Sequence, residues 1–170
     1  QQIDFVNLPA SEFSDPLMGE YSGAGALFGK TGGVMEAAIR TVYYKLTGSE
    51  LPSLEFTQVK GNTRLREATI ELAGGTTVRA AVCQGVQIAR SILDDIANGK
   101  SDYDFVEVMA CPAGCISGGG QPRQKGLYQA MSDARVRGIQ HIDRNKTVHQ
   151  SHNNKQIQKL YETFLESPNS

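Results

Sequence analysis

The sequence has no tryptophan, only three cysteines and no apolar run longer than four residues. Without a long apolar run, it predicts neither a transmembrane helix nor the hydrophobic region of a signal peptide. The odd cysteine count argues against a closed disulfide framework and favours a reducing or oxygen-free compartment. We expect a cytoplasmic protein, with the periplasm and the hydrogenosome as alternatives. Charge is balanced, with 17 basic and 18 acidic residues, and predicts no binding to nucleic acid or anionic membranes.

The 170 residues, 39% of them hydrophobic, fit one ordinary globular domain. Strand-like and helix-like segments alternate, which predicts the α/β class. We expect a mainly parallel sheet with flanking helices and one antiparallel β-hairpin. The chain begins at Gln1 with no Met and soon enters an apolar stretch at residues 3–6, which favours a portion of a longer protein or a processed subunit.

Hydrophobic periodicity places most of the elements. Period-two alternation on both sides of Gly74-Gly75 predicts the hairpin, and helical spacing predicts a helix that begins near Thr31 and ends at Gly48. Residues 10–33 are glycine-dense and loop-like, and residues 123–150 are polar and basic. The remaining expected elements are strands at 3–6, 54–59 and 105–109 and helices at 86–98 and 154–165.

The cysteines carry the chemistry of the sequence. Cys111 and Cys115 are four residues apart, directly after the apolar strand 105–109, and thiolates are soft ligands for zinc, copper(I) or iron–sulfur clusters. If Pro112 starts a helical turn, both sulfurs point to one side and the N–H groups at its start stabilise them. A zinc site or a [4Fe–4S] cluster needs about four ligands, however. Cys83 falls in the hairpin and is expected to be a core residue, so two ordinary thiols on a tight turn remain an alternative.

Two longer blocks resemble one family. Residues 105–122, Phe-Val-Glu-Val-Met-Ala-Cys-Pro-Ala-Gly-Cys-Ile-Ser-Gly-Gly-Gly-Gln-Pro, are similar to the last cluster-binding motif of the [FeFe]-hydrogenases, in which Gly usually stands where this chain has Ala113. Residues 23–40 resemble the glycine-rich segment of that family. The family's two earlier cysteine motifs do not occur here. The resemblance therefore implies that residues 1–170 are the C-terminal portion of a bilobal catalytic (H-cluster) domain, with 123–170 its polar tail and closing helix.

The resemblance also implies a cofactor, the H-cluster, in which a [4Fe–4S] cubane is linked to a two-iron unit with CO, cyanide and dithiolate ligands. Cys111 would ligate the cubane, and Cys115 would ligate it and bridge to the two-iron unit. Met109 would pack beside that unit, with Phe28 and Gly29 on its other side. The implied activity is reversible H2 oxidation and proton reduction, with no catalytic acid or base assigned in this half. The implied partners are the N-terminal half of the domain, ferredoxin or a similar electron carrier, H2 and protons, and the chain alone is expected to be inactive.

Other readings remain open. Hydrogenase-like iron–sulfur assembly proteins of the Nar1/Narf type share the two-cysteine motif but lack the two-iron unit, and a non-catalytic sensory or degenerate module is a third possibility. Gly29-Lys30-Thr31 ends like a phosphate-binding P-loop, but Ala24 occupies the position of its first glycine, so that motif fails. We expect Lys30 and Glu36 to be solvated or capping charges. The basic stretch 123–150 is expected to be a solvated surface rather than a docking face for an electron donor.

Overall fold

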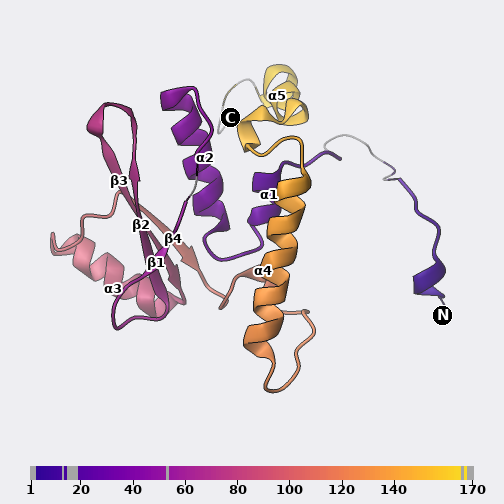
Figure 1. Ribbon diagram of the computed structural model, residues 1–170, viewed down its shortest axis with the longest axis horizontal. Coiled ribbons are helices and arrows are strands. Elements are labelled where there is room, and N and C mark those ends of the chain that lie inside the picture. The colour runs from indigo at the N-terminus through magenta and orange to yellow at the C-terminus, as the bar shows by residue number, and fades with distance from the viewer. Residues whose placement is uncertain (1–2, 13, 15–18, 53, 166, 168–170) are drawn as a thin grey trace.

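The computed structural model describes residues 3–12, 14, 19–52, 54–165 and 167. A four-stranded sheet forms one half of the molecule, and a group of helices forms the other (Figure 1). The elements are α1 (Gly23–Leu27), α2 (Gly33–Thr47), β1 (Thr57–Gln58), β2 (Leu65–Glu71), β3 (Thr77–Gln84), α3 (Val86–Ala97), β4 (Phe105–Met109), α4 (Tyr128–Asn145) and α5 (Lys155–Leu160).

The sheet has the strand order β1-β2-β3-β4. β2 and β3 form the expected hairpin, in which Ala68 faces Ala80 and the turn contains Gly74 and Gly75, both at positive φ. β4 pairs with β3 in parallel after a crossover through α3. The α/β class and the hairpin are thus confirmed. The expectation of a mainly parallel sheet is wrong for this part of the chain, because the short connections around β2 force antiparallel pairs on both of its sides.

Helices cover both faces of the sheet. On one face, α2 places Met35 and Ile39 on a cluster that includes Ile70 and Val82, and on the other, α3 places Ala89 and Ile92 on Ala81 and Cys83. β3 is buried on both faces, which explains its run of four consecutive apolar residues, 80–83. Cys83 is fully buried there, as the sequence predicted.

The second half of the molecule contains α1, α4 and α5, which lie on the side of α2 away from the sheet (Figure 1). α1 is a short helix capped by Ser22, whose hydroxyl accepts the N–H of Gly25 at 3.1 Å. α5 begins at Asn154, which caps it with its side-chain oxygen, and continues as a π-helical turn over Tyr161–Leu165.

Four expectations for local structure are wrong. Residues 10–33, which were expected to be loop-like, contain the short helix α1. Residues 3–6 form no strand: Phe5–Asn7 is a 3-10 turn, and Phe5 is 82% exposed because no neighbouring strand pairs with it. The strand expected at 54–59 is reduced to two residues, 57 and 58. The polar stretch 123–150 contains the longest helix among the described residues, α4.

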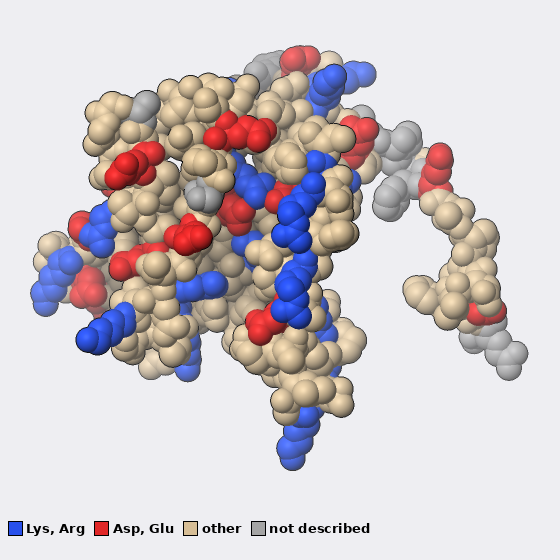
Figure 2. Space-filling model, in the orientation of Figure 1, with Lys and Arg blue, Asp and Glu red and all other residues tan. Residues whose placement is uncertain are grey.

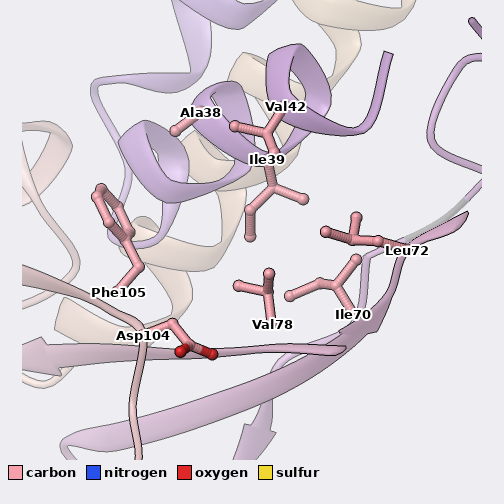
Figure 3. A pocket seen from close by; sticks show the side chains of 8 residues that line it. All are labelled: Ala38, Ile39, Val42, Ile70, Leu72, Val78, Asp104 and Phe105. Carbon is pink, nitrogen blue, oxygen red and sulfur yellow. The ribbon is translucent and has the colours of Figure 1, made fainter. Parts of the chain in front are cut away.

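An apolar groove remains open between α2 and the sheet (Figure 3). Val42 of α2 and Phe105 at the start of β4 are each 46% exposed beside it, and its volume is about 220 Å³. Its walls come from α2, the hairpin and the start of β4: Ala38, Ile39, Val42, Ile70, Leu72, Val78, Asp104 and Phe105. This part of the core therefore keeps apolar side chains in contact with solvent.

Candidate cofactor site

The two cysteines lie on a tight turn that follows β4. The N–H of Gly114 donates to the carbonyl of Cys111 at 3.1 Å, and Cys115 starts a single 3-10 turn that ends at Ser117. The helix expected to start at Pro112 is therefore not formed; Pro112 occupies the second position of a β-turn, which its fixed φ favours. Cys111 and Cys115 are exposed free thiols.

Ala113 occupies the third position of this turn at φ +61°, which makes it the one non-glycine residue with positive φ among the described residues. That conformation costs an L-residue about 1–2 kcal/mol and costs glycine almost nothing, which gives a physical reason for the glycine in the usual motif.

We predict that Ala113→Gly raises the free energy of unfolding by up to about 1 kcal/mol, because relief of the strained φ outweighs the added entropy of the unfolded chain. Urea denaturation measures this change. The matched control is Ala134→Gly, at an exposed position inside α4, which should lower stability by about 1 kcal/mol. A loss of stability in both variants would contradict the argument from strain.

Two backbone hydrogen bonds hold the cysteine turn against the connection between α1 and α2. The N–H of Thr31 donates to Ala113 at 3.2 Å, and the N–H of Ile116 donates to Gly29 at 3.1 Å. A Cβ on Gly114 would lie 2.7 Å from the carbonyl oxygen of Gly29, closer than side-chain carbons approach backbone. The structure thus brings Gly29 against the cysteine turn, and only glycine fits at 114.

Helix α4 supports the turn from another side. The Tyr128 hydroxyl donates to the carbonyl of Pro112 at 3.1 Å, and Arg135 donates to the carbonyl of Ile116 at 2.9 Å. The hydroxyls of Ser117 and Ser132, both buried, lie 2.7 Å apart. Figure 2 shows basic side chains along α4, but Arg135 is not simply a solvated charge, since it holds the backbone next to the cysteines.

Glu107 is a site residue that the sequence analysis missed. It lies in the middle of β4, is 7% exposed, and accepts the N–H groups of Gly32 and Met35, each at 2.7 Å. These donors lie at the N-cap and in the first turn of α2, so the carboxylate caps that helix from the neighbouring strand. The signal available in the sequence was a lone acidic residue inside an otherwise apolar strand.

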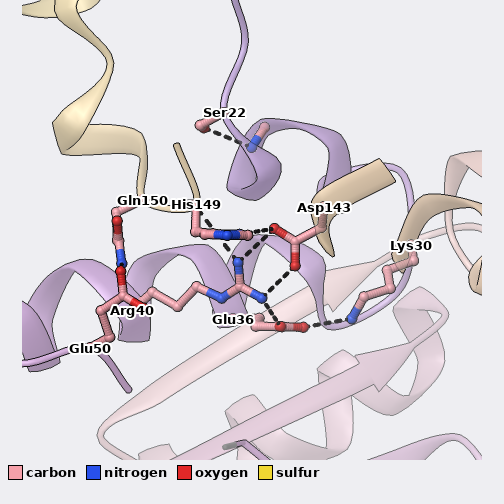
Figure 4. A network of polar contacts seen from close by, with 9 residues as sticks. Ser22, Lys30, Glu36, Arg40, Glu50, Asp143, His149 and Gln150 are labelled. Atoms are coloured by element: carbon pink, nitrogen blue, oxygen red, sulfur yellow. Dashed lines mark hydrogen bonds and ion pairs between the residues drawn. The ribbon is translucent and has the colours of Figure 1, made fainter. Parts of the chain in front are cut away.

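A network of buried charges links α2 to α4 (Figure 4). Lys30 pairs with Glu36 at 2.8 Å, Glu36 pairs with Arg40 at 2.6 Å, and Arg40 makes two hydrogen bonds to Asp143, at 2.8 and 2.9 Å. His149 Nδ1 lies 3.4 Å from the same carboxylate. Lys30 is 9% exposed, so the expectation of a solvated or capping charge is wrong for Lys30, whereas Glu36 lies in the first turn of α2, where an acidic side chain favours the helix.

The pKa of Asp143 links this network to the pH dependence of stability. Burial raises its pKa, but the hydrogen bonds and positive charge of Arg40, with a smaller effect of His149, outweigh burial and hold the pKa below its usual 3.8. In return, the hydrogen bonds that Arg40 donates to Asp143 raise the pKa of Arg40, against the effect of burial. Because the unfolded carboxyl takes up its proton at higher pH than the folded one, this stabilisation is complete above about pH 5. It is lost as the pH falls from the usual carboxyl pKa of 3.8 through the lower pKa of the folded state.

We predict that Asp143→Asn lowers the free energy of unfolding at pH 7 by about 3 kcal/mol, since it leaves the Arg40 guanidinium without its bidentate partner. The variant should also lose less stability than the wild type between pH 5 and pH 3. Urea denaturation across that range measures both effects. Asp94→Asn, on the exposed face of α3, is the control and should keep the wild-type pH dependence; parallel profiles for Asp143→Asn and the wild type would contradict the linkage.

The predicted site residues occupy two neighbouring segments. Phe28 follows α1 and is 47% exposed next to Gly29, and Met109 ends β4 just before the cysteine turn. Cys83 is not part of the site: it is buried under α3, and burial raises its thiol pKa. The described residues contain no group of three or more His, Cys, Asp or Glu side chains that could hold a metal ion. The site therefore offers two ligands, Cys111 and Cys115, exposed on a turn whose glycine backbone allows a bulky group to approach.

A polar cleft of about 490 Å³ borders this turn at Pro112 and Ala113. Lys30 and Thr31 line the same cleft, and the buried hydroxyl of Thr31 has no hydrogen-bond partner among the described residues. The other walls of the cleft come from the strands, the loop before β2 and α4: Gln58, Thr63, Arg66, Gln84, Tyr128, Gln129, Ser132, Asp133, Val136 and Gln140.

Two family models divide the chain between them. The iron-only hydrogenase large subunit, C-terminal domain, matches residues 1–119, and the iron hydrogenase small subunit matches residues 129–170. Within the described part of the chain, no helix is long and apolar enough to span a bilayer.

Several known proteins are similar to the chain. The periplasmic [Fe] hydrogenase large subunit of Nitratidesulfovibrio vulgaris is 46% identical over 135 residues, which cover 79% of this chain and 32% of that protein. Iron hydrogenase 1 of Clostridium pasteurianum is 37% identical over 98% of this chain and 29% of its own length. Protein NAR1 of Arabidopsis thaliana is 32% identical over 99% of this chain and 36% of its own length. A solved [FeFe]-hydrogenase of Chlamydomonas reinhardtii superposes with a TM-score of 0.74 at 37% identity and covers 99% of this chain and 48% of that one.

Proposed function

Because the chain belongs to the iron-only hydrogenase family, we propose that it supplies one wall of an H-cluster site in an enzyme that interconverts H2 with protons and electrons. The observation that carries this proposal is the placement of Cys111 and Cys115. Both are exposed free thiols on a turn at the carboxyl end of β4, and the α1–α2 connection and α4 hold the turn's backbone in place. That arrangement suits ligation of a large cluster rather than a buried structural ion.

In this proposal Cys111 and Cys115 would be two of the four cubane ligands, and Cys115 would also help to hold the two-iron unit. When bound, the H-cluster supplies the bond cleavage and the redox chemistry, while the protein orients it and excludes water. Met109 would contact the two-iron unit from the end of β4, and Phe28 and Gly29 would close its pocket from the end of α1. No residue of this chain is assigned as a catalytic acid or base.

The other ligands must come from outside this chain. The chain spans about a third of the length of the curated relatives it matches and about half of the solved hydrogenase chain. We propose that the N-terminal half of the catalytic domain, in the same parent polypeptide or in a separate subunit, provides the remaining two cysteines. An electron carrier of the ferredoxin type and a reducing compartment such as the cytoplasm complete the proposal, and the three free cysteines are in keeping with that compartment.

Infrared spectroscopy of the anaerobically purified parent assembly tests the proposal. Stretching bands of CO and cyanide ligands, together with bound iron and H2 turnover, are expected when this chain is assembled with the other half. The isolated chain is expected to show none of the three, because half the cubane ligands are missing. Robust H2 turnover by the pure 170-residue chain would overturn the assignment of ligands.

A cluster-assembly role is the second candidate. It is favoured by the similarity to Protein NAR1 over 99% of this chain and by relatives named cytosolic Fe-S cluster assembly factors. That role needs the cysteines but no two-iron unit. Bound iron without CO or cyanide bands in the assembled protein would therefore select it over the hydrogenase.

A further inference from the structure

Polar side chains replace the apolar core at one end of the sheet. On the face that α2 covers, Ala68 of β2 and Val82 of β3 belong to the core. Side chains alternate along a strand, so Arg66 and Gln84 lie on this same face, two residues away. Gln58 of β1 stands opposite Arg66 in the antiparallel pair. These three polar side chains, from three neighbouring strands, all line the polar cleft of about 490 Å³ beside the cysteine turn.

Arg66 brings to this cleft a positive charge that has no acidic partner. The residue is half-buried, and its side chain makes no ion pair or hydrogen bond with any described residue. Lys30 also lines the cleft, but its ammonium group pairs with Glu36 at 2.8 Å. Asp133 is the one acidic side chain among the described residues that line the cleft, and it accepts a hydrogen bond from Gln129 at 2.8 Å. A partly desolvated guanidinium without a counter-charge favours an anion as its partner.

Thr31 is a second group in the cleft that lacks a partner. It is 6% exposed, and its buried hydroxyl makes no hydrogen bond with any described residue. Its backbone is fixed, because its N–H donates to the carbonyl of Ala113 at 3.2 Å. A buried hydroxyl without a partner costs free energy, so a ligand that supplies an acceptor gains affinity there. An oxyanion can accept from a hydroxyl and from a guanidinium fork at the same time.

The cleft is distinct from the cysteine ligands. Its walls include Pro112 and Ala113, but neither Cys111 nor Cys115 is among the described residues that line it. A ligand in the cleft would therefore contact the backbone of the turn without occupying the thiols.

We propose that Arg66, Thr31 and Gln84 form a binding site for an oxyanion, a carboxylate or phosphate group, beside the cysteine turn. The Arg66 fork supplies the charge, and the Thr31 hydroxyl and the Gln84 amide supply further donors. The oxyanion is either a free anion or a carboxylate side chain from the N-terminal half of the domain. This proposal does not depend on the cluster or on the hydrogenase activity.

Titration of the 170-residue chain with inorganic phosphate and, separately, with acetate tests the site. Two-dimensional NMR at constant ionic strength should show saturable shifts of the Nε–H of Arg66 and of the backbone N–H groups of Thr31 and Gln84. The absence of a saturable shift with both anions would overturn the proposal.

Charge variants show whether Arg66 carries the binding. Arg66→Gln should raise the Kd for phosphate at least about tenfold, because it removes the fork and the charge. Arg64→Gln removes the same charge from an exposed position outside the cleft and should change the Kd by less than about twofold. Asp133→Asn should lower the Kd, since it removes a like charge from the cleft. Equal effects of Arg66→Gln and Arg64→Gln would refute a site on Arg66.

Thr31→Val separates binding from stability. Valine keeps the shape and removes the unpaired hydroxyl, so the chain should unfold at a higher urea concentration while the Kd for phosphate rises at least about threefold. A lower urea midpoint with an unchanged Kd would refute the role of the Thr31 hydroxyl in binding.

Modification of Arg66 by phenylglyoxal, mapped by mass spectrometry in the parent assembly, distinguishes the two sources of the oxyanion. If the ligand is a free anion, Arg66 should react in the assembly and phosphate should protect it. If a carboxylate of the other half is the ligand, Arg66 should be unreactive in the assembly even without phosphate. Reaction at the same rate in the assembly and in the chain alone, without protection by phosphate in either, would overturn the proposal.

Discussion

Replacing Cys115 with serine is expected to abolish retention of the two-iron unit in the assembled protein. A serine hydroxyl is a hard and weakly acidic ligand and does not replace a bridging thiolate between iron centres. The expected result is complete loss of the CO and cyanide infrared bands and of H2 turnover. Because Cys115 lies on an exposed turn, the substitution should change the stability of the chain by less than about 0.5 kcal/mol.

Two further cysteine variants make this result specific. Cys111→Ser should lower total iron by removing a cubane ligand, while Cys83→Ala should leave both iron and the infrared bands intact, because Cys83 is buried under α3. Cys83→Ala should instead lower stability, since it removes a buried sulfur from the core. Full H2 turnover in Cys115→Ser would contradict the ligand assignment, and loss of the bands in Cys83→Ala would show that the assay responds to stability alone.

The periodicity of apolar residues predicted the elements that form the hydrophobic core. In the hairpin, α2, α3 and β4, apolar side chains recur at the spacing of a strand or a helix and pack into the core between the sheet and the two helices. All four elements are confirmed. The strand expected at residues 3–6 failed because an apolar stretch is stable as a strand only next to a partner, and Phe5 has none.

Helix α4, which the apolar periodicity did not predict, is held in place by polar contacts. α4 buries Ser132 and Asp143 rather than an apolar stripe, and its Arg135 binds the carbonyl of Ile116. Such contacts leave no 3.6-residue pattern in hydropathy. These contacts also join residues far apart in the sequence, such as Arg40 and Asp143, so a pattern within one segment of the sequence cannot predict them.

The candidate site was accessible to sequence analysis only in part. The motif located Cys111 and Cys115, and the structure brings Gly29 into hydrogen-bonding contact with their turn. Their assignment as ligands stays a prediction. Tyr128, which supports the turn, and Glu107, which caps the neighbouring helix α2, were not identified, because each acts on backbone groups that the sequence does not single out.

Glu107→Ala is expected to lower the free energy of unfolding by about 3 kcal/mol or more. It leaves the buried N–H groups of Gly32 and Met35 without acceptors and opens a cavity between β4 and α2. Urea denaturation measures the loss. Glu71→Ala removes an exposed carboxylate from β2 and should change stability by less than about 0.5 kcal/mol.

Glu107→Gln separates the charge from the shape of this side chain. An amide offers only one acceptor oxygen, so one of the two N–H groups would face its NH2, and the loss should be smaller than for alanine but still above about 1 kcal/mol. Since Gly32 follows directly on the Gly29–Thr31 segment that binds the cysteine turn, both Glu107 variants should also change the reactivity of Cys111 and Cys115 toward iodoacetamide. Wild-type stability in Glu107→Gln would show that the carboxylate charge is dispensable, and unchanged cysteine reactivity in Glu107→Ala would show that the turn is held without the cap on α2.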